Sequence, residues 1–138
     1  KERVTAEDLP FIISDVLGNN IPDKVQIESY VLTHSKGLSP TTSISVKING
    51  VSFEENSSGD GQYDAFWNAL GKIYKRQKLS LPQLIDYAVR IPPGSNSDAL
   101  CETTITWRTK NKEFTTRGLD SDQTVSAIKA TEKMLNII

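Results

Sequence analysis

The first apolar pattern in the chain has the period of a helix. Thr5 stands before Glu7 and Asp8, which is typical of a helix N-cap followed by acidic residues in the first turn. Apolar side chains then recur at helical spacing: Leu9, Ile12, Ile13, Val16 and Leu17. Residues 18–20, Gly-Asn-Asn, end the pattern. We therefore predict a linker helix segment within residues 1–23, with an apolar stripe suited to packing on a neighbouring domain.

Residues 25–53 alternate between apolar and polar positions, as strands do. The alternation predicts strands over residues 25–32, 44–48 and 51–53. Asn49-Gly50 lies between the second and third, and both residues tolerate the positive φ of a type I′ hairpin turn. The polar residues 56–61 are predicted as a loop. A helix follows to about residue 77, with these side chains on one face: Tyr63, Phe66, Leu70, Ile73 and Tyr74.

The second half of the chain has the same order of patterns. Strands are predicted over residues 84–89 and 99–107, with a loop at 92–97 between them, and Phe114 marks a third strand. A helix is predicted over residues 122–138.

A shift of 61 residues superposes the two halves. It places Ile44 on Ile105, Phe53 on Phe114 and Gln62 on Gln123, while Tyr30 and Tyr87 need a slightly shorter shift. We predict an α+β fold of two pseudo-symmetric βββα units from an internal duplication, preceded by the linker helix. The duplicated part then spans residues 24–138, with units at about 24–78 and 83–138.

Composition limits the classes of function. The 138 residues include sixteen Lys and Arg against seventeen Asp and Glu, a net charge of −1, which does not favour nucleic-acid binding. One Cys and one His exclude a disulfide framework, a Cys-rich zinc site and any site with two histidines. Since the chain opens on Lys1 and its only methionine is Met134, we expect a piece of a longer protein. The single cysteine agrees with a reducing compartment, and we expect a location in the cytoplasm.

The most informative polar stretch is Gly59-Asp60-Gly61, just before the first predicted helix of the repeat. Glycines there allow close approach of a ligand, and a helix N-terminus favours a carboxylate. Asp60 and Asp64 would repel a polyanion but suit an ammonium group, so the pair of preferences indicates an α-amino acid. The alternative is an ordinary N-capped helix after a loop.

The last helix opens in a similar way, with Ser121, Asp122 and Gln123. In a pseudo-symmetric pair, the two helix N-termini can build one site across both halves or across two subunits. Apolar walls would come from Tyr63, Leu84, Tyr87 and Ile91, although each of these is more often a core residue. His34 is read as a surface or turn residue, and Cys101 as a small buried one.

Several separated motifs together resemble one family. They are Asn49-Gly50, residues 59–65 (Gly-Asp-Gly-Gln-Tyr-Asp-Ala), residues 84–87 (Leu-Ile-Asp-Tyr), residues 98–100 (Asp-Ala-Leu) and the helix start from Gly118 to Asp122. This order resembles the C-terminal regulatory (LeuA allosteric/dimerisation) domain of the α-isopropylmalate synthase and citramalate synthase family, from about Lys24 to the end.

The resemblance implies a dimerising domain that binds the end-product leucine or isoleucine at the dimer interface. It implies that the parent condenses acetyl-CoA with a 2-oxo acid in a barrel that needs a divalent metal and precedes this segment. This fragment should then have no catalytic residues, no metal and no cofactor. Carried over by motif, the effector-binding residues are Asp60, Tyr63, Asp64, Leu84, Tyr87, Ile91, Ser97, Cys101, Ser121 and Gln123.

Two branches of the family fit the chain. Our first hypothesis is the regulatory domain of a 2-isopropylmalate synthase of leucine biosynthesis. The alternative is the same domain of (R)-citramalate synthase, which binds isoleucine; Tyr63 and the start Gln123-Thr124-Val125 are closer to that branch, whereas Ser121 stands where it commonly has proline. From other classes, we keep a structural dimerisation module without an effector and a small enzyme that uses Asp60, Asp64 and His34.

Overall fold

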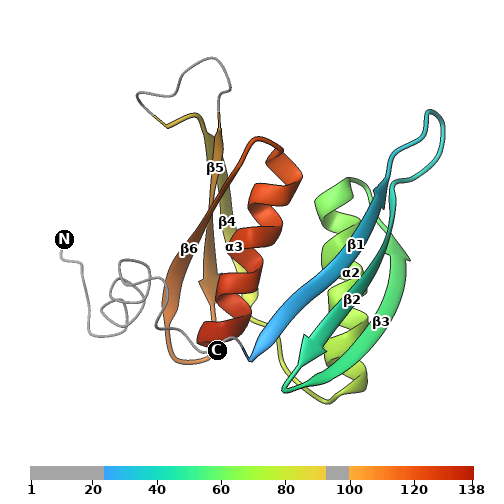
Figure 1. The fold of residues 1–138 in the computed structure, drawn as a ribbon. Helices are drawn as coiled ribbons and strands as arrows, with labels where there is room; N and C mark the ends of the chain where they lie inside the picture. Colours follow the sequence, from blue (N-terminus) through green and yellow to red (C-terminus); the bar gives the residue numbers. More distant parts are fainter. Residues whose placement is uncertain (1–23, 93–99) are drawn as a thin grey trace. The chain divides into compact units, whose positions relative to one another are not determined.

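The computed structural model describes residues 24–92 and 100–138, which form two compact units (Figure 1). Each unit is a three-stranded antiparallel sheet followed by a helix, so the predicted α+β class and the two βββα units are confirmed. The linker helix predicted within residues 1–23 lies outside the described residues. The elements are β1 (Val25–Thr33), β2 (Thr41–Ile48), β3 (Val51–Ser58), α2 (Gln62–Arg76), β4 (Gln83–Arg90), β5 (Cys101–Arg108), β6 (Glu113–Asp120) and α3 (Gln123–Ile137).

The hairpin between β2 and β3 forms where the sequence predicts it. Ile48 pairs with Val51, and the two residues between them have positive φ, 49° at Asn49 and 86° at Gly50. One prediction is wrong: β3 continues to Ser58, through residues assigned above to a loop. Ser57 pairs with Thr42 and Ser58 with Thr41, because pairing with β2 outweighs the weak strand propensity of these polar residues.

The core of the first unit lies between one face of its sheet and α2. Ile44 and Val46 alternate inward from β2 and are almost fully buried. The buried side of α2 carries Ala65, Phe66, Ala69, Leu70, Ile73 and Tyr74. Burial raises the pKa of the Tyr74 hydroxyl to about 12. Tyr63, which the sequence placed on the same helix face, is only half-buried.

The core of the second unit is built in the same way but contains more hydroxyl groups. Trp107 Nε1 donates to Thr116 Oγ1 at 2.9 Å, and that hydroxyl donates to the Ala130 carbonyl of α3 at 2.7 Å. A Cβ atom on Gly118 would lie 2.0 Å from the Ser126 carbonyl oxygen, so only glycine permits β6 to come this close to α3.

The duplication extends to the irregular parts of the strands. Each first strand has a β-bulge, between Ile27 and Ser29 in β1 and between Leu84 and Asp86 in β4. After its bulge, Tyr30 pairs with Ile44 in one unit and Tyr87 with Ile105 in the other. The shorter shift for the two tyrosines is thereby confirmed.

In both units the helix packs mainly on the second and third strands of its sheet (Figure 1). The first strand, β1 or β4, is therefore less covered on the side that faces the helix. On β4 this side carries Tyr87 and Val89, opposite the buried residues Ile105 and Thr103 of β5. The candidate site begins on this strand.

Candidate functional site

Four of the predicted site residues form two contacting pairs near the start of α3. The Tyr87 side chain, from the middle of β4, is hydrogen-bonded to the side chain of Gln123, the first residue of α3. Cys101, the first residue of β5, points its Sγ at the Ser121 carbonyl oxygen, 4.0 Å away. Burial raises the pKa of the Tyr87 hydroxyl, and the bond with Gln123 opposes this shift. The cluster thus joins two strands and a helix start.

Two further predicted residues extend the cluster along β4. The bulge in β4 places Leu84 on the same face as Tyr87, although the two are three residues apart, because Leu84 pairs with Trp107 and Tyr87 with Ile105. Ile91, just beyond β4, is 62% exposed. These side chains form an apolar strip beside the polar Tyr87–Gln123 pair.

Sequence reasoning missed Val89 as a member of this strip. Val89 pairs with Thr103, whose side chain is buried against α3, so Val89 lies on the same face as Tyr87. It is 37% exposed. The alternation of Tyr87, Val89 and Ile91 was the available signal, since a strand places every second residue on one face.

A pair of buried hydroxyl groups lies under the first turn of α3, and sequence reasoning missed it as well. Thr103 Oγ1 and Ser126 Oγ are 2.5 Å apart, and Ser126 Oγ donates to the Gln123 carbonyl oxygen at 2.7 Å. No pattern in the sequence marks this pair, because it joins a strand to a helix 23 residues later.

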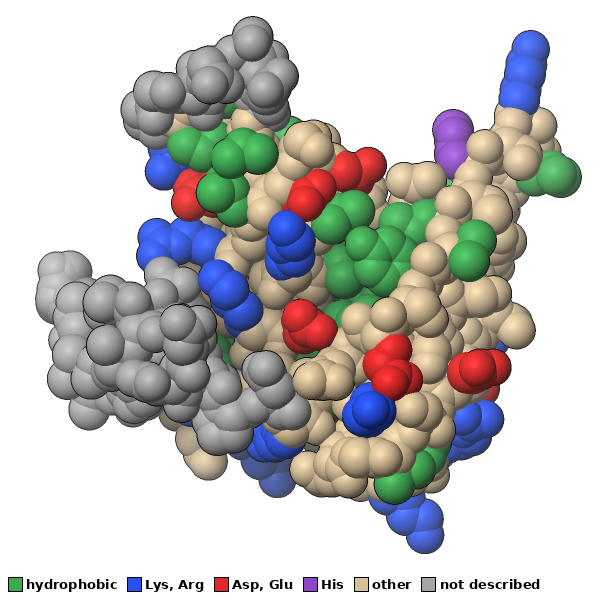
Figure 2. Space-filling model, viewed as in Figure 1, with side chains coloured by type: hydrophobic (Ala, Val, Ile, Leu, Met, Phe, Trp, Pro, Cys, Tyr) green, Lys and Arg blue, Asp and Glu red, His purple; other side chains and the backbone are tan. Residues whose placement is uncertain are grey.

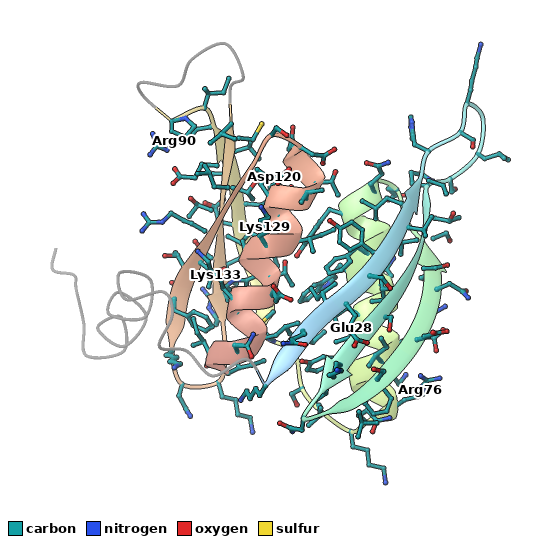
Figure 3. All side chains as sticks on the ribbon, viewed as in Figure 1. Glu28, Arg76, Arg90, Asp120, Lys129 and Lys133 are labelled. Carbon is teal, nitrogen blue, oxygen red and sulfur yellow. The ribbon has the colours of Figure 1, made fainter. Side chains whose placement is uncertain are left out.

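Two carboxylates, those of Asp120 and Asp122, accept backbone hydrogen bonds at the start of α3. Asp122 is the N-cap, and its Oδ1 accepts from the Val125 N–H at 3.0 Å. Asp120 accepts from the Asp122 N–H at 2.9 Å and from Lys129 Nζ at 2.9 Å (Figure 3). These donors, the backbone N–H first, lower the pKa of Asp120. The carboxylates at this helix start are thus engaged by the protein's own donors.

The remaining predicted residues lie at the start of α2 in the other unit. Asp64 Oδ2 accepts from the Asp60 N–H at 2.8 Å, which folds the preceding loop onto the helix. Tyr63 packs against Phe66 and Trp67, with ring centroids 5.7 and 6.5 Å apart. The N-cap Gly61 has no side chain that accepts from the helix N–H groups, unlike Asp122 in α3.

The role of Gly59 differs from the prediction. A Cβ atom there would lie 2.5 Å from the Ala65 backbone nitrogen, so the close approach that this glycine permits is to α2 itself rather than to a ligand. Ser97 lies outside the described residues. A single site formed by both helix starts stays a prediction.

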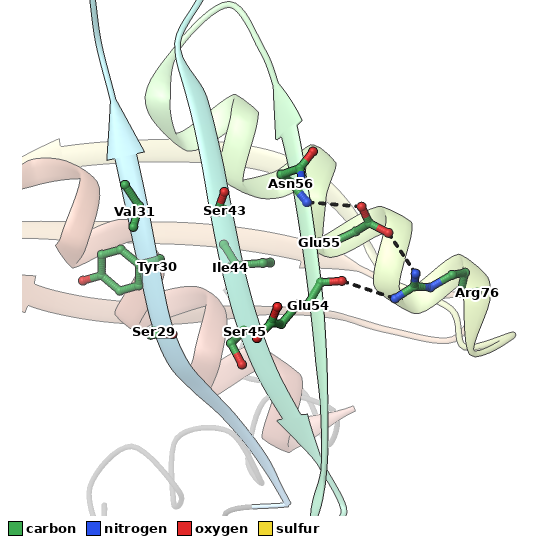
Figure 4. Close-up of a pocket in the computed structure, with 10 residues that line it drawn as sticks. All are labelled: Ser29, Tyr30, Val31, Ser43, Ile44, Ser45, Glu54, Glu55, Asn56 and Arg76. Atoms are coloured by element: carbon green, nitrogen blue, oxygen red, sulfur yellow. Dashed lines mark hydrogen bonds and ion pairs between the residues drawn. The ribbon is translucent and has the colours of Figure 1, made fainter.

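A separate pocket of about 480 Å³ lies on the first sheet (Figure 4). Arg76 borders it, bonded to the Glu55 carboxylate at 3.1 Å and to the Glu54 carbonyl oxygen. The other lining residues are Ser29, Tyr30, Val31, Ser43, Ile44, Ser45 and Asn56. None of the predicted effector residues lines this pocket, whose walls combine the apolar Tyr30, Val31 and Ile44 with polar side chains.

Two other kinds of feature, a metal site and a membrane-spanning helix, concern the described ranges. Residues 24–92 and 100–138 contain no group of three His, Cys, Asp or Glu side chains able to hold a metal ion. In the same ranges, no helix has the length and apolar character needed to cross a membrane. Acidic and basic side chains are interspersed over the face seen in Figure 2.

Comparison with known proteins gives one consistent result. The profile of the family described as the LeuA allosteric (dimerisation) domain matches residues 3–138. A candidate (R)-citramalate synthase of Archaeoglobus fulgidus is 29% identical over 137 residues, 99% of this chain and 27% of that protein. The 2-isopropylmalate synthase of Heliobacterium modesticaldum is also 29% identical, over all of this chain and 26% of that protein. The chain thus spans about a quarter of the length of these relatives.

Proposed function

Because the chain belongs to the family of LeuA allosteric (dimerisation) domains, we propose that it is the feedback-regulatory and dimerisation domain of a 2-isopropylmalate synthase. In this proposal it binds leucine at the interface between two copies. The alternative within the family is the same domain of an (R)-citramalate synthase, with isoleucine as effector. One relative named as a citramalate synthase and one named as a 2-isopropylmalate synthase match the chain equally well, each at 29% identity.

The cluster at the start of α3 is the observation that carries effector binding. An α-amino acid with a branched side chain needs polar groups for its two charges and an apolar wall for its side chain. The Tyr87–Gln123 pair provides a polar group, Leu84 and Val89 line the same face of β4, and the exposed Ile91 follows just beyond the strand.

The start of α2 supports the recognition of the two charged groups. A helix N-terminus attracts a carboxylate through its N–H groups and dipole, and the N-cap Gly61 presents no side chain that would compete. Asp60 and Asp64 are acidic partners for the ammonium group. We propose that each of the two helix starts contributes to effector recognition in the dimer, with Ser97 as a further member.

The regulation we propose works by linkage. Effector bound at the dimer interface favours an arrangement of the parent that is less active, so effector and substrate turnover are coupled through a shared equilibrium. Condensation of acetyl-CoA with a 2-oxo acid, and the divalent metal it needs, belong to the barrel of the parent. This fragment itself is proposed to catalyse no reaction.

Leucine and isoleucine differ in the position of one methyl group. An apolar pocket distinguishes such isomers by about 1–3 kcal/mol, or about 10- to 200-fold in affinity. The identity of the effector therefore follows from the shape of the apolar strip on β4 and from the groups opposite it.

Calorimetric titration of this chain with L-leucine and, separately, L-isoleucine tests the proposal, with the mass in solution measured by light scattering. We expect a dimer that binds one of the two amino acids at least tenfold more tightly. Tyr87→Ala should abolish this binding, whereas the exposed hairpin variant Val51→Ala serves as the matched control and should bind normally.

Two results would count against the proposal. A dimer that binds neither amino acid would favour the structural dimerisation module, and a parent enzyme that keeps its feedback inhibition after removal of this domain would refute the regulatory role.

A further inference from the structure

Among the differences between the two helix starts, one concerns a buried hydroxyl pair. Thr103 and Ser126 in the second unit correspond, 61 residues earlier, to Thr42 and Ala65 in the first. Both threonines are at most 2% exposed, yet Thr103 bonds to Ser126 while Thr42 Oγ1 has no hydrogen-bond partner among the described residues. Since β2 and α2 pack without such a bond, the hydroxyl pair is not required by the βββα architecture.

The direction of the bonds follows from the number of protons. Each hydroxyl has one hydrogen to donate. Ser126 Oγ donates its hydrogen to the Gln123 carbonyl oxygen at 2.7 Å, so Thr103 must donate to Ser126 Oγ at 2.5 Å. The chain of bonds thus runs from the centre of β5, through Ser126, to the backbone of the first residue of α3.

The side chain of that same residue continues the connection to β4. Gln123 bonds to Tyr87 through its side chain and to Ser126 through its carbonyl oxygen. Thr103 and Ser126 are both fully buried, so water does not compete for the bond between them, while the bond from Ser126 to Gln123 is partly buried. Gln123 is therefore held at both its backbone and its side chain.

We propose that Thr103 and Ser126 are positioning residues for the effector site, and that they hold Gln123 in place against Tyr87. The inference rests on the proposed function, because it assigns a role in that same site. Neither residue touches the effector. Their contribution is to reduce the freedom of the Gln123 amide before the effector binds, so that less order has to be created on binding.

The test compares effector binding by calorimetry across matched variants. Ser126→Ala and Thr103→Val each break the chain of bonds, and we expect the dissociation constant to rise about two- to tenfold, the worth of one hydrogen bond. Thr103→Ser keeps the hydroxyl and should bind within about twofold of the wild type, since it restores the same bond.

Thr116→Val is the control for stability alone. Thr116 is also a fully buried hydroxyl that bonds from the sheet to α3, but it contacts the Ala130 carbonyl in the middle of the helix. We expect Thr116→Val to lower the melting temperature at least as much as Ser126→Ala, because it also removes the acceptor of Trp107 Nε1, and to leave the affinity for the effector unchanged. Equal affinity in Ser126→Ala and wild type, or an equal loss in Thr116→Val, would overturn the inference.

A second readout needs no ligand and separates this inference from the proposed function. In NMR spectra of the dimer, the nuclear Overhauser effect between the Gln123 side-chain amide and the Tyr87 ring should be present in the wild type and weakened in Ser126→Ala. If it is unchanged, Ser126 does not position Gln123. If the effect weakens in Ser126→Ala as expected, but the wild type binds neither amino acid, the proposed function is refuted and the positioning role of Ser126 is still supported.

Discussion

The unpartnered hydroxyl of Thr42 leads to a quantitative prediction. Thr42 lies on the helix side of β2, is 2% exposed and has a hydroxyl with no hydrogen-bond partner among the described residues. Valine has nearly the same shape but carries a methyl group instead of this hydroxyl. Thr42→Val should therefore stabilise the domain.

The size of the effect follows from the cost of a buried polar group. Leaving a buried hydroxyl unsatisfied costs about 1–3 kcal/mol of folding free energy. We expect the free energy of unfolding of Thr42→Val to be about 1 kcal/mol higher than that of the wild type. For a chain of this size the melting temperature should rise by about 2–8 °C.

The equivalent substitution in the second unit should have the opposite sign. Thr103 makes a hydrogen bond with Ser126 at 2.5 Å, so Thr103→Val loses about 0.5–1.5 kcal/mol. The same chemical change at two equivalent positions thus gives a gain in one unit and a loss in the other, and the difference between the two variants is about 2 kcal/mol.

Urea denaturation followed by far-UV circular dichroism measures both variants, and the midpoint should shift while the slope stays constant. A third variant tests the cause: Ala65→Ser offers Thr42 the partner that Ser126 offers Thr103. It should stabilise the wild type but not Thr42→Val. If Thr42→Val is destabilised as much as Thr103→Val, the Thr42 hydroxyl has a partner and the reasoning is wrong.

Three further predictions test other parts of the structure. Gly118→Ala should lower the free energy of unfolding by about 3 kcal/mol or more in urea denaturation, because its Cβ atom would overlap a helix carbonyl. As a control, Gly71→Ala on α2, where a Cβ atom meets open space, should raise the free energy of unfolding by about 0.5–1 kcal/mol. Equal effects of the two substitutions would contradict the close packing of β6 on α3. The wild type should lose stability as the pH rises from 10 through about 12, since the raised pKa of Tyr74 favours the neutral hydroxyl in the fold, and Tyr74→Phe should lack this loss in alkaline melting curves. Because the pKa of Asp120 is lower in the folded protein than its ordinary value of 3.8, the ionised carboxylate stabilises the fold above pH 3.8. This stabilisation is lost as the pH falls through the folded pKa, so the free energy of unfolding should fall less in Asp120→Asn than in the wild type during an acid titration.

The regular elements were predictable from the sequence because their causes are local. Alternation and helical spacing predicted the strands and both helices of the repeat, and Asn49-Gly50 predicted the hairpin turn. The end of β3 was not predictable in this way. Residues 56–58 are polar and favour a loop by themselves, and they form a strand only because β2 offers partners for their backbone groups.

Part of the candidate site was predictable as well. The resemblance pointed to Tyr87, Cys101, Ser121 and Gln123, and the fold places Tyr87 against Gln123 and Cys101 against Ser121. Val89 and the Thr103–Ser126 pair were missed. Val89 looks like an ordinary strand residue, and which strand remains uncovered depends on where α3 packs.

The sequence by itself determined the order of the elements and the internal repeat, since these depend on side-chain periodicity along the chain. Only the tertiary structure brought Thr103 within hydrogen-bond distance of Ser126, 23 residues later in the chain. Thr42 and Thr103 have the same residue type in the same register, and the difference comes from one position in the facing helix, Ala65 or Ser126. A hydrogen bond needs two groups within about 3 Å, and that distance is set by how strand and helix pack.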